Sequence, residues 1–368
     1  MSSEALIDHS SDRIGQAIVK VVGIGGGGCN AVTRMYHERI LGVEYMAVNT
    51  DAQHLMQLDV PTKIRVGDKL TRGLGVGGNP DIGRDSAEES RDELYEATRG
   101  SDMVFVAAGM GGGTGTGACP VVAEIAKESG ALTIAVVTKP FSFEGHRRKK
   151  QAEDGINLLR DRVDSLIVIP NDRLLDMCDD NVTTEQAFRL ADDVLRQAVQ
   201  AIAELVTISG TINLDFADVK SIMSGAGPAW MAIGSASGEN RAVEAARAAI
   251  NSPLLDVSIE GARGVLLNVA GGADLTMHEV HKAAAEIEEM VDPNVNLIFG
   301  MVQDLKLEDE VRVTIIATGF PGVDAFIPEE DLIWTQLGLN EPNGEDDLDV
   351  PPFLRRHPTL RRRARQGL

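Results

Sequence analysis

The sequence predicts an α/β protein that combines a mostly parallel sheet with a smaller second domain. In its first half, short β-branched apolar runs alternate with stretches of helical periodicity, which is typical of strand–helix units in a parallel sheet. The length of 368 residues exceeds one ordinary domain and suits two. The 38 glycines also exceed the usual share of about 7%, and many of them fall in turns after expected strands.

Strands and helices are expected in regular alternation through the first half. The strands are the buried runs at 18–22, 45–48, 103–108, 132–137 and 166–169. Helical periodicity covers 30–41, 85–99, 119–129 and 147–163. Apolar runs this short, separated by helices, predict a parallel sheet that is covered on both faces.

A longer helix is predicted over 183–208. Leu190, Val194 and Ala198 lie on one apolar stripe of this helix, and a second stripe runs beside it. A helix that is apolar over so much of its circumference is expected to be buried between two layers. Thr183 or Thr184 can cap its start. We therefore predict that this helix joins the two domains.

The second domain is predicted to be a smaller α+β unit. Its expected strands are 230–235, 264–269, 297–301 and 311–317, with helices at 241–251 and 276–290. From 321 to 349 the chain is rich in turn residues and ends in an acidic run, as solvated linkers do. The following tail begins with an apolar pair and continues basic. We expect the linker and the tail to be disordered.

The charge is distributed unevenly. The net charge is −21, but the last 18 residues hold six arginines and no acidic residue, so residues 1–350 carry −27. A body this acidic argues against non-specific binding to nucleic acid or anionic lipid, because both are polyanions. The tail alone could bind either.

A cytoplasmic protein with no membrane insertion is expected. Cys29, Cys119 and Cys178 lie far apart without CxxC spacing, which excludes a thiolate metal site and fits a reducing compartment. Residues 1–13 lack a signal-peptide pattern. The longest uncharged run, 103–123, holds six glycines and a proline, which disfavours a membrane-spanning helix.

Three glycine-rich segments follow expected strands. Residues 23–28 satisfy GxGxxG, and Asp51 follows 23 residues later, which is the dinucleotide-binding pattern. Residues 109–117 hold six glycines in nine positions, before a helix whose positive end favours anions. Two such loops indicate a di- or triphosphate held from both sides, and residues 73–80 could close over its end. No GK[ST] sequence exists, so this is not a Walker-type loop.

The run GGGTGTG at 111–117 is the tubulin-family signature, and the chain resembles the FtsZ family of prokaryotic, tubulin-like cell-division GTPases. The resemblance covers roughly 15–318. Further motifs are NTDAQ at 49–53, KPFSFEG at 139–145, IPND at 169–172 and NLDFAD at 213–218. One departure is Cys29, where the family commonly has Gly or Ala.

The resemblance implies a tubulin-like architecture. A Rossmann-type GTP-binding domain is expected over 1–178, with its first residues disordered, and a central helix over 179–209. A C-terminal activation domain would follow over 210–319, then a linker over 320–350 and a partner-binding peptide over 351–368. It also implies GTP or GDP with Mg²⁺ as ligands, and GTP hydrolysis that depends on polymerisation.

The motifs and the resemblance together give the expected nucleotide-binding residues. Glu144 and Arg148 would lie at the ribose and phosphate edge, while Asn30, Asn171, Phe188 and Asp192 would recognise or stack on guanine. Without the resemblance, Phe188 would be read as a core residue. The full set is Gly26, Gly27, Gly28, Cys29, Asn30, Asp51, Gly77, Gly78, Gly111, Gly112, Gly113, Thr114, Gly115, Thr116, Gly117, Glu144, Arg148, Asn171, Phe188 and Asp192.

Asn213, Asp215 and Asp218 have two interpretations. From the residues alone, Asp215 is an N-cap for a helix that begins near Phe216. The resemblance implies that this loop enters the nucleotide site of the next subunit, where the carboxylates orient the attacking water. Such a head-to-tail contact does not close on itself, so it would build the filament of a division ring.

Other interpretations remain open. GxGxxG with Asp51 also suits an NAD-dependent oxidoreductase, which would show neither guanine preference nor assembly. A tubulin-like protein that binds GTP without a role in division is a second alternative. His278 and His281 form HxxH without a third ligand, so a solvated helix face is favoured over a metal site. By resemblance, Phe353, Leu354, Arg355 and Arg356 would bind membrane-tethering division proteins; otherwise this segment is a disordered basic end.

Overall fold

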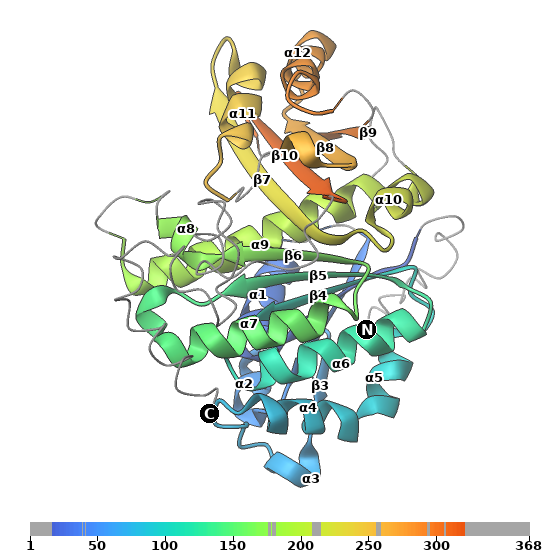
Figure 1. Cartoon of the computed structure of the whole chain (residues 1–368), viewed down its shortest axis with the longest axis vertical. Helices are drawn as coiled ribbons and strands as arrows, with labels where there is room; N and C mark the ends of the chain where they lie inside the picture. The colour runs from blue at the N-terminus through green and yellow to red at the C-terminus, as the bar shows by residue number, and fades with distance from the viewer. Residues whose placement is uncertain are drawn as a thin grey trace, which may run out of the picture. The chain divides into compact units, whose positions relative to one another are not determined.

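One sheet of ten strands forms the frame of the described part of the chain (Figure 1). The computed structural model describes residues 17–38, 40, 42–175, 178, 182–207, 215–254, 259–292, 295–304 and 307–320. The strand order is β3-β2-β1-β4-β5-β6-β7-β10-β8-β9. The predicted linker beyond residue 320 and the tail lie outside the described residues.

The first six strands are all parallel to their neighbours. They are β1 (Val19–Ile24), β2 (Val43–Asn49), β3 (Thr62–Arg65), β4 (Met103–Gly109), β5 (Leu132–Lys139) and β6 (Ser165–Pro170). Five of them confirm the predicted strands. The sixth, β3, was not predicted, because only Ile64 of its four residues is buried and so short an edge strand shows no periodicity.

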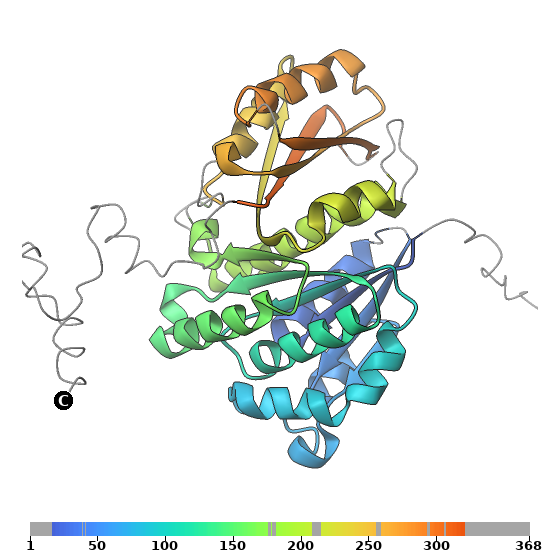
Figure 2. The same ribbon diagram turned by 45° about the vertical axis from the view of Figure 1, so that its right-hand side comes forward.

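Helices cover both faces of this parallel sheet, as predicted (Figure 2). The helices of the first half are α1 (Gly25–Glu38), α2 (Ala52–Gln57), α3 (Asp68–Thr71), α4 (Pro80–Glu89), α5 (Arg91–Thr98), α6 (Thr114–Glu128), α7 (His146–Arg160) and α8 (Asn171–Leu175). Helix α1 packs on one face, where it meets α9 (Thr184–Thr207), and α6 and α7 pack on the other.

Three helix predictions need correction. The helix expected over 85–99 is two helices, because α4 begins at Pro80 and the chain breaks at Ser90. Asn79 caps α4 by accepting a hydrogen bond from the Asp81 amide at 3.0 Å, and proline suits the first helical position. Helices α1 and α6 begin at Gly25 and Thr114, earlier than expected, because glycine's low helix propensity concealed their first turns.

Helix α9 confirms the long helix predicted between the two parts. Thr183 and Gln186 form a reciprocal cap, with the Gln186 amide 3.2 Å from Thr183 Oγ1 and the Thr183 amide 2.8 Å from Gln186 Oε1. Val194, Ala198 and Ile202 are buried in the core that α9 shares with the sheet. At 1.5 Å per residue, its 24 residues span about 36 Å.

The C-terminal part has the mixed pairing of an α+β unit. Strand β7 (Gly227–Ser237) continues the parallel sheet beside β6, and β10 (Glu310–Thr318) runs antiparallel between β7 and β8 (Gly264–Gly271). Strand β9 (Asn296–Gln303) lies parallel to β8. Helices α11 (Arg241–Ile250) and α12 (Met277–Glu288) pack over a second, alanine-rich core.

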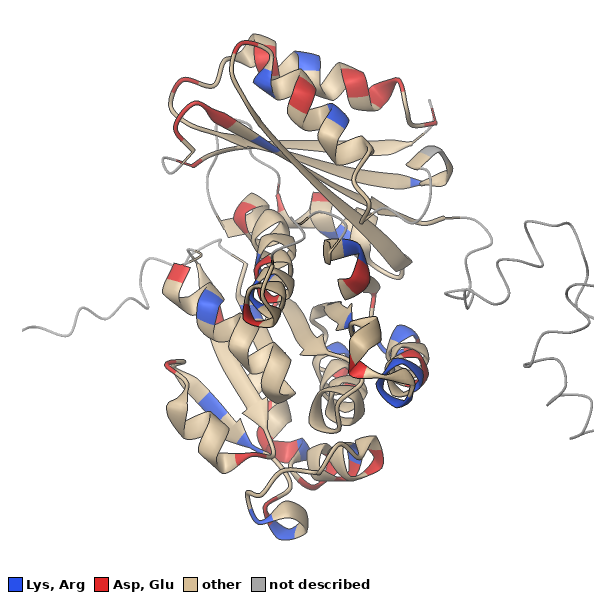
Figure 3. Ribbon diagram, turned by 90° about the vertical axis from the view of Figure 1, so that its left-hand side faces the viewer, with Lys and Arg blue, Asp and Glu red and all other residues tan. Residues whose placement is uncertain are grey.

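Charged residues of both signs lie along many of the helices (Figure 3). Many are paired, and Arg241 is the most buried of these cations. It lies 2.8 Å from Glu279 Oε1 and 2.6 Å from Asp274 Oδ2. The hydrogen bond from Arg241 lowers the pKa of Glu279 to about 2. No helix among the described residues is long and apolar enough to cross a membrane.

Candidate functional site

The carboxyl ends of the parallel strands form one edge, and the glycine loops lie there. The strand ends are nearly in register: Ile24 of β1 pairs with Ala108 of β4, and Gly109 of β4 pairs with Thr138 of β5. The loops after β1 and β4 therefore leave the sheet side by side, and the third glycine segment, which follows α3 (Asp68–Thr71), reaches the second loop where Asn79 meets Gly113. This edge is where ligands bind in open α/β sheets.

Some of the glycines are required because the three loops pack backbone against backbone. A Cβ placed on Gly28 would lie 2.2 Å from the carbonyl oxygen of Ala107, and one on Gly25 would lie 2.6 Å from the amide nitrogen of Gly115. A Cβ on Gly113 would lie 2.8 Å from the amide nitrogen of Asn79. No side chain fits at such distances, so these glycines hold the loops in one rigid arrangement.

At other glycines, close packing within the protein does not explain the missing side chain. A Cβ on Gly26 or Gly112 would meet no protein atom within 4 Å, and neither residue has a positive φ. Gly77 and Gly78 are also open but do have positive φ values, which glycine adopts without strain. At Gly26 and Gly112 the missing side chain therefore leaves room for a group that approaches the backbone closely.

The electrostatics of this edge favour an anion. Helices α1 and α6 both begin here, at the first and second glycine loops, and a helix amino end carries partial positive charge and free N–H groups. Combined with the open space at Gly26 and Gly112, this arrangement fits a phosphate chain. The first glycine loop thus forms the opening turn of α1 rather than a loop that precedes it.

Threonine hydroxyls fix the second loop. Thr114 Oγ1 lies 2.7 Å from Thr50 Oγ1, which joins the start of α6 to the turn after β2. Thr116 Oγ1 accepts a hydrogen bond from the Gly111 amide at 2.8 Å. Both predicted threonines therefore use their hydroxyls within the protein, and they hold the loop in shape.

A second group of predicted residues lies where α8 and α9 pack together beside the same edge. Asn171 is buried, and its Oδ1 finds no hydrogen-bond partner among the described residues. The Phe188 ring is 41% exposed and makes edge contacts with Phe141 and Phe143, with ring centroids 5.4 and 6.3 Å away. An unpaired buried acceptor and an exposed aromatic ring suit a planar ligand that has hydrogen-bond donors.

Asp192 lies one helical turn beyond Phe188 on α9. Burial raises the pKa of its carboxyl group to about 6, although Arg34 opposes this shift from 3.3 Å away. A mostly buried carboxylate is costly unless a donor meets it. The side chain is therefore suited to accept hydrogen bonds from a ligand.

Glu144 and Arg148 lie at the start of α7, beside the second glycine loop. Glu144 Oε1 accepts a hydrogen bond from the Phe141 amide at 3.0 Å, and Glu144 Oε2 pairs with Arg148. A Cβ on Gly111 would lie 2.8 Å from the Arg148 carbonyl oxygen, which shows how closely α7 approaches the loop. The Arg148 guanidinium is exposed while it pairs with Glu144, so an anion could approach it from the solvent side.

Cys29 and Asp51 use their side chains inside the protein. Cys29 Sγ lies 3.4 Å from the Gly23 carbonyl oxygen within the core, and burial raises the pKa of this thiol to about 12. Only its backbone can serve a ligand. Asp51 Oδ1 caps α2 by accepting hydrogen bonds from the amides of Gln53 and His54.

Sequence reasoning missed His54. Its Nε2 lies 3.0 Å from Asn30 Oδ1, and its Nδ1 lies 3.0 Å from Asn49 Nδ2. The imidazole thus links the turn after β2 to a predicted nucleotide-binding residue on α1. Its position next to the NTDAQ motif was the only signal in the sequence.

The predicted catalytic aspartates lie at the opposite edge of the sheet. Asp218 lies on α10 (Phe216–Met223) and Asp215 is its N-cap. The last residue of this helix, Met223, accepts a hydrogen bond from Ser165 at the amino end of β6. Figure 1 shows α10 at the far end of α9 from α8. The structure therefore does not bring Asp215 and Asp218 to the glycine loops of their own chain. Asn213 lies outside the described residues.

The predicted cap at Asp215 is confirmed. Asp215 Oδ1 accepts a hydrogen bond from the Asp218 amide at 2.9 Å, and Asp218 Oδ2 accepts one from the Asp215 amide at 3.4 Å. Both side chains are exposed. The reciprocal cap holds two carboxylates at a fixed spacing on the surface.

Comparison with known proteins gives the family. Residues 18–179 match the GTPase domain of the Tubulin/FtsZ family, and residues 227–321 match the C-terminal domain of the FtsZ family. The structure of an empty FtsZ dimer from M. jannaschii is 49% identical, with a TM-score of 0.80, and the match covers 83% of this chain and 88% of that one. The chain belongs to the FtsZ family.

More distant relatives share the fold. CetZ1 from Haloferax volcanii, solved as a GDP-bound monomer, is 24% identical with a TM-score of 0.71, and the match covers 83% of this chain and 95% of that one. CetZ2 from the same organism, solved as a GTPγS-bound protofilament, is 19% identical with a TM-score of 0.70. That match covers 83% of this chain and 94% of the CetZ2 chain.

Membership of the FtsZ family confirms the predicted fold and makes the chain a tubulin-like GTPase that binds guanine nucleotide. It rules out the NAD-dependent oxidoreductase, whose GxGxxG pattern is here the start of α1. His278 and His281 lie on α12, and the described residues hold no group of three side chains arranged for a metal ion.

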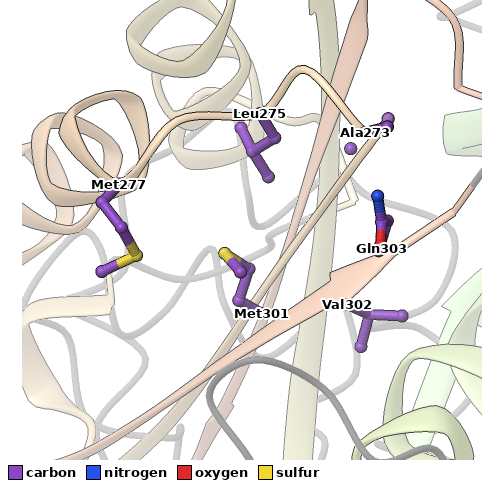
Figure 4. Close-up of a pocket in the computed structure, with 8 residues that line it drawn as sticks. Ala273, Leu275, Met277, Met301, Val302 and Gln303 are labelled. Carbon is purple, nitrogen blue, oxygen red and sulfur yellow. The ribbon is translucent and has the colours of Figure 1, made fainter.

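A pocket of about 200 Å³ lies away from this site, at the carboxyl ends of β8 and β9 (Figure 4). Leu275, Met277 and Met301 line it, together with Gln303 and backbone of the β8–α12 connection. None of its lining residues carries a titratable side chain. The pocket therefore has no group suited to acid–base or nucleophilic chemistry, and the candidate site stays at the glycine loops.

Proposed function

We propose that the chain is a GTP-dependent polymerising cytoskeletal protein that forms the division ring. GTP would be hydrolysed to GDP and phosphate where subunits meet head to tail. The observation that carries this proposal is that Asp215 and Asp218 lie with α10 at the amino edge of the parallel sheet, at the far end of α9 from α8 (Figure 1), whereas the glycine loops lie at the carboxyl edge. Within one chain these carboxylates cannot reach a nucleotide held by the loops, so a second subunit must supply them.

The glycine loops would hold the phosphates. Backbone N–H groups at the starts of α1 and α6 would bind phosphate oxygens, and the open positions at Gly26 and Gly112 would admit them. Glu144 and Arg148 would meet the ribose and the phosphate edge. This is the role that the exposed Arg148 guanidinium supports.

The guanine base would lie between α8 and α9. Its N1–H and exocyclic amine can donate hydrogen bonds to the Asp192 carboxylate. Adenine does not offer these two donors in the same arrangement. Asn171 would contribute the acceptor that is unpaired in the described structure, and Phe188 would stack on the base.

Asp215 and Asp218 would act on the attacking water, with Asn213 beside them. A carboxylate would accept the proton of this water as its oxygen attacks the γ-phosphorus. The bond from the γ-phosphorus to the β–γ bridging oxygen would break, releasing GDP and phosphate. The reciprocal cap supports this role, because it presents both carboxylates in a fixed position before the next subunit arrives.

Such a contact is heterologous, because each subunit presents a different edge to its two neighbours, and it extends into a filament. The dimer solved for M. jannaschii FtsZ and the protofilament solved for CetZ2 support assembly of this kind. Each active site would then be complete only within the polymer.

Mg²⁺ would accompany the nucleotide. This ion takes oxygen ligands and usually keeps several waters, so it would be held chiefly by phosphate oxygens and water. The site fits this ion, because the space beside Gly26 and Gly112 is open among the described residues and the nearby Cys29 thiol is buried in the core. When bound, the ion would neutralise the charge that develops on the phosphates.

We also propose that the protein works in the cytoplasm at the division site, beneath the membrane. Membrane-tethering division proteins would bind Phe353, Leu354, Arg355 and Arg356, with the aromatic side chain as anchor. These residues lie outside the described part of the chain, so this part of the proposal rests on the sequence alone.

The test is the GTPase rate per molecule at increasing protein concentration, with sedimentation in parallel. We expect the rate to rise steeply above the concentration at which polymer first pellets, because each site needs its neighbour. A rate per molecule that does not change with concentration, without any pellet, would refute catalysis between subunits.

A further inference from the structure

We infer that His54 positions Asn30 for nucleotide binding through a relay of hydrogen bonds that begins in the backbone after β2. This inference rests on the proposed function, since it takes Asn30 as a nucleotide-binding residue. It adds a residue that neither the motifs nor the family resemblance singled out. The relay runs from the Thr50 amide through Asn49 and His54 to Asn30.

The orientation of the Asn49 amide is fixed by the turn. Asn49 Oδ1 accepts hydrogen bonds from the backbone amides of Thr50 at 2.9 Å and Asp51 at 3.4 Å. A flipped side chain would point its NH₂ group at these two N–H donors. Because Asn49 is buried, it cannot turn to water instead. Its Nδ2 must therefore face His54.

This orientation sets the tautomer of His54. Asn49 Nδ2 donates to His54 Nδ1 at 3.0 Å, so Nδ1 carries no proton and Nε2 does. His54 Nε2 then donates to Asn30 Oδ1 at 3.0 Å. With Oδ1 occupied, the Nδ2 donor of Asn30 is the group left for a ligand. Asn30 is exposed on α1, one turn after the open Gly26, so this donor lies beside the proposed nucleotide space.

The relay makes the site sensitive to protonation of the imidazole. A proton on Nδ1 would place two donors against each other, and Asn49 cannot respond by turning its amide. The contact would break and release Asn30.

The charged groups around the ring lie on three neighbouring elements. Asp51 caps the ring's own helix and accepts from the His54 amide, and Arg34 lies on α1 one turn beyond Asn30, paired with Asp192 of α9. Arg65 of β3 approaches α2 and is paired with Asp68. Each of these groups already has a partner of opposite charge or a backbone donor, so Asn30 and Asn49 remain the neighbours that decide the ring's tautomer.

The experiment is a double-mutant cycle on GDP affinity, measured by calorimetry below the concentration at which the protein assembles. We expect His54→Ala and Asn30→Ala each to weaken GDP binding about three- to tenfold, the size of a lost neutral hydrogen bond. The double variant should bind no worse than Asn30→Ala alone, because His54 acts through Asn30. Additive losses, or a His54→Ala variant that binds as tightly as the parent, would overturn the inference.

His54→Gln is the matched control. Glutamine carries one acceptor and one donor, like the neutral imidazole. It should bind GDP within about twofold of the parent at pH 7.5. A His54→Gln variant that binds as weakly as His54→Ala would also overturn the inference.

Failure of the proposed function would look different. In that case the parent protein would not bind GDP, or Asn30→Ala alone would bind it normally. A thermal melt of each variant without nucleotide serves as the folding control, and we expect the Tm values of His54→Gln and the parent to agree.

Discussion

The two edges of the parallel sheet are built in different ways. At the carboxyl edge, close-packed glycines and buried hydroxyl contacts hold three loops together, and the open positions are backbone. At the amino edge, a reciprocal helix cap holds two exposed carboxylates. The proposed phosphate-binding loops are thus held by internal contacts, whereas the proposed catalytic carboxylates lie on the surface. This difference suits a site that binds in the monomer and reacts only after assembly.

The contrast has an energetic side. A change inside the glycine cluster disturbs packing and folding, because each loop is the neighbour of the others. A change at Asp215 removes one cap, which costs about 1 kcal/mol, and leaves the rest of the fold untouched. Folding and the proposed chemistry are therefore separable at the amino edge, whereas at the carboxyl edge they are joined wherever a glycine is closely packed, as at Gly28.

The largest effect is expected at Asp215. Asp215→Asn should lower GTP hydrolysis about 10²–10⁴-fold, the range for a lost general base. Asparagine is as good an N-cap as aspartate, so the Tm should not fall. Asp215→Ala should lose activity equally and also about 1 kcal/mol of stability. Turnover by polymer and thermal melts check both, and near-normal turnover by an Asp215→Asn, Asp218→Asn protein would remove these residues from the mechanism.

Mixing two inactive variants, one altered at each edge of the sheet, tests whether the two edges act together across subunits. Gly112→Asp should not bind nucleotide, because the new carboxylate occupies the open space and repels phosphate, yet it keeps its own Asp215. Added to Asp215→Asn subunits, it should restore part of their turnover by supplying intact carboxylates. Gain of activity in the mixture over the sum of the separate proteins is the measurement.

A second prediction separates the two kinds of glycine. Gly112→Val should weaken GDP binding about ten- to hundredfold, because its side chain would fill space that the ligand needs, with little change in Tm. Gly28→Ala should instead destabilise the protein by about 1–3 kcal/mol, because its Cβ would press on the Ala107 carbonyl. Calorimetry and urea unfolding distinguish them. Loss of stability in Gly112→Val would contradict the assignment of open space.

Asp192 should show a pH-dependent effect of about tenfold on binding, the size of a hydrogen bond to a charged acceptor. Since burial raises its pKa to about 6, GDP affinity should fall as the pH drops through 6 and the carboxylate is lost. Asp192→Asn should bind weakly at all pH values and discriminate less against adenine nucleotides. Equal affinities for GDP and ADP in the parent would contradict the assignment of Asp192 to guanine recognition.

The ionisation of Asp192 affects folding stability in the opposite direction from GDP binding. The folded pKa of Asp192 lies above its ordinary value of 3.8, so the neutral carboxyl favours the folded state. This contribution is present below pH 3.8 and is lost as the pH rises through about 6. Without nucleotide, the difference in stability between Asp192→Asn and the parent should therefore shift in favour of the variant as the pH rises from 4 to 7, as urea titrations can measure.

The sequence predicts those elements whose burial leaves a local apolar pattern. The parallel strands and α9 were predictable because their apolar periodicity reflects burial, which the chain carries locally. Strand β3 was not, since Ile64 alone is buried in it. The starts of α1 and α6 were missed because contacts among the loops, such as Gly25 against Gly115, override the low helix propensity of glycine.

Within the site, motif residues could be found but their partners could not. Thr114 and Asp51 belong to recognisable motifs, yet only the structure shows that their side chains bond within the protein to Thr50 and to the α2 amides. His54 carries no motif, and its link to Asn30 spans 24 residues of sequence. Contacts of this kind depend on how the sheet order places α1 beside α2, which no local pattern encodes.

The smallest effect on GDP binding is expected at Asn171. Here the direction of the change in Tm distinguishes a binding role from a structural one. Its Oδ1 is buried without a partner, so the folded protein bears the cost of an unsatisfied acceptor until a donor arrives. Asn171→Ala should therefore leave the Tm unchanged or raise it slightly, while GDP binding weakens about three- to fivefold. Asn171→Asp keeps an acceptor and should restore binding, but it buries a charge and should lower the Tm. Calorimetry and thermal melts on the three proteins decide the matter: if Asn171→Ala lowers the Tm and leaves GDP affinity intact, the side chain serves the fold and not the base.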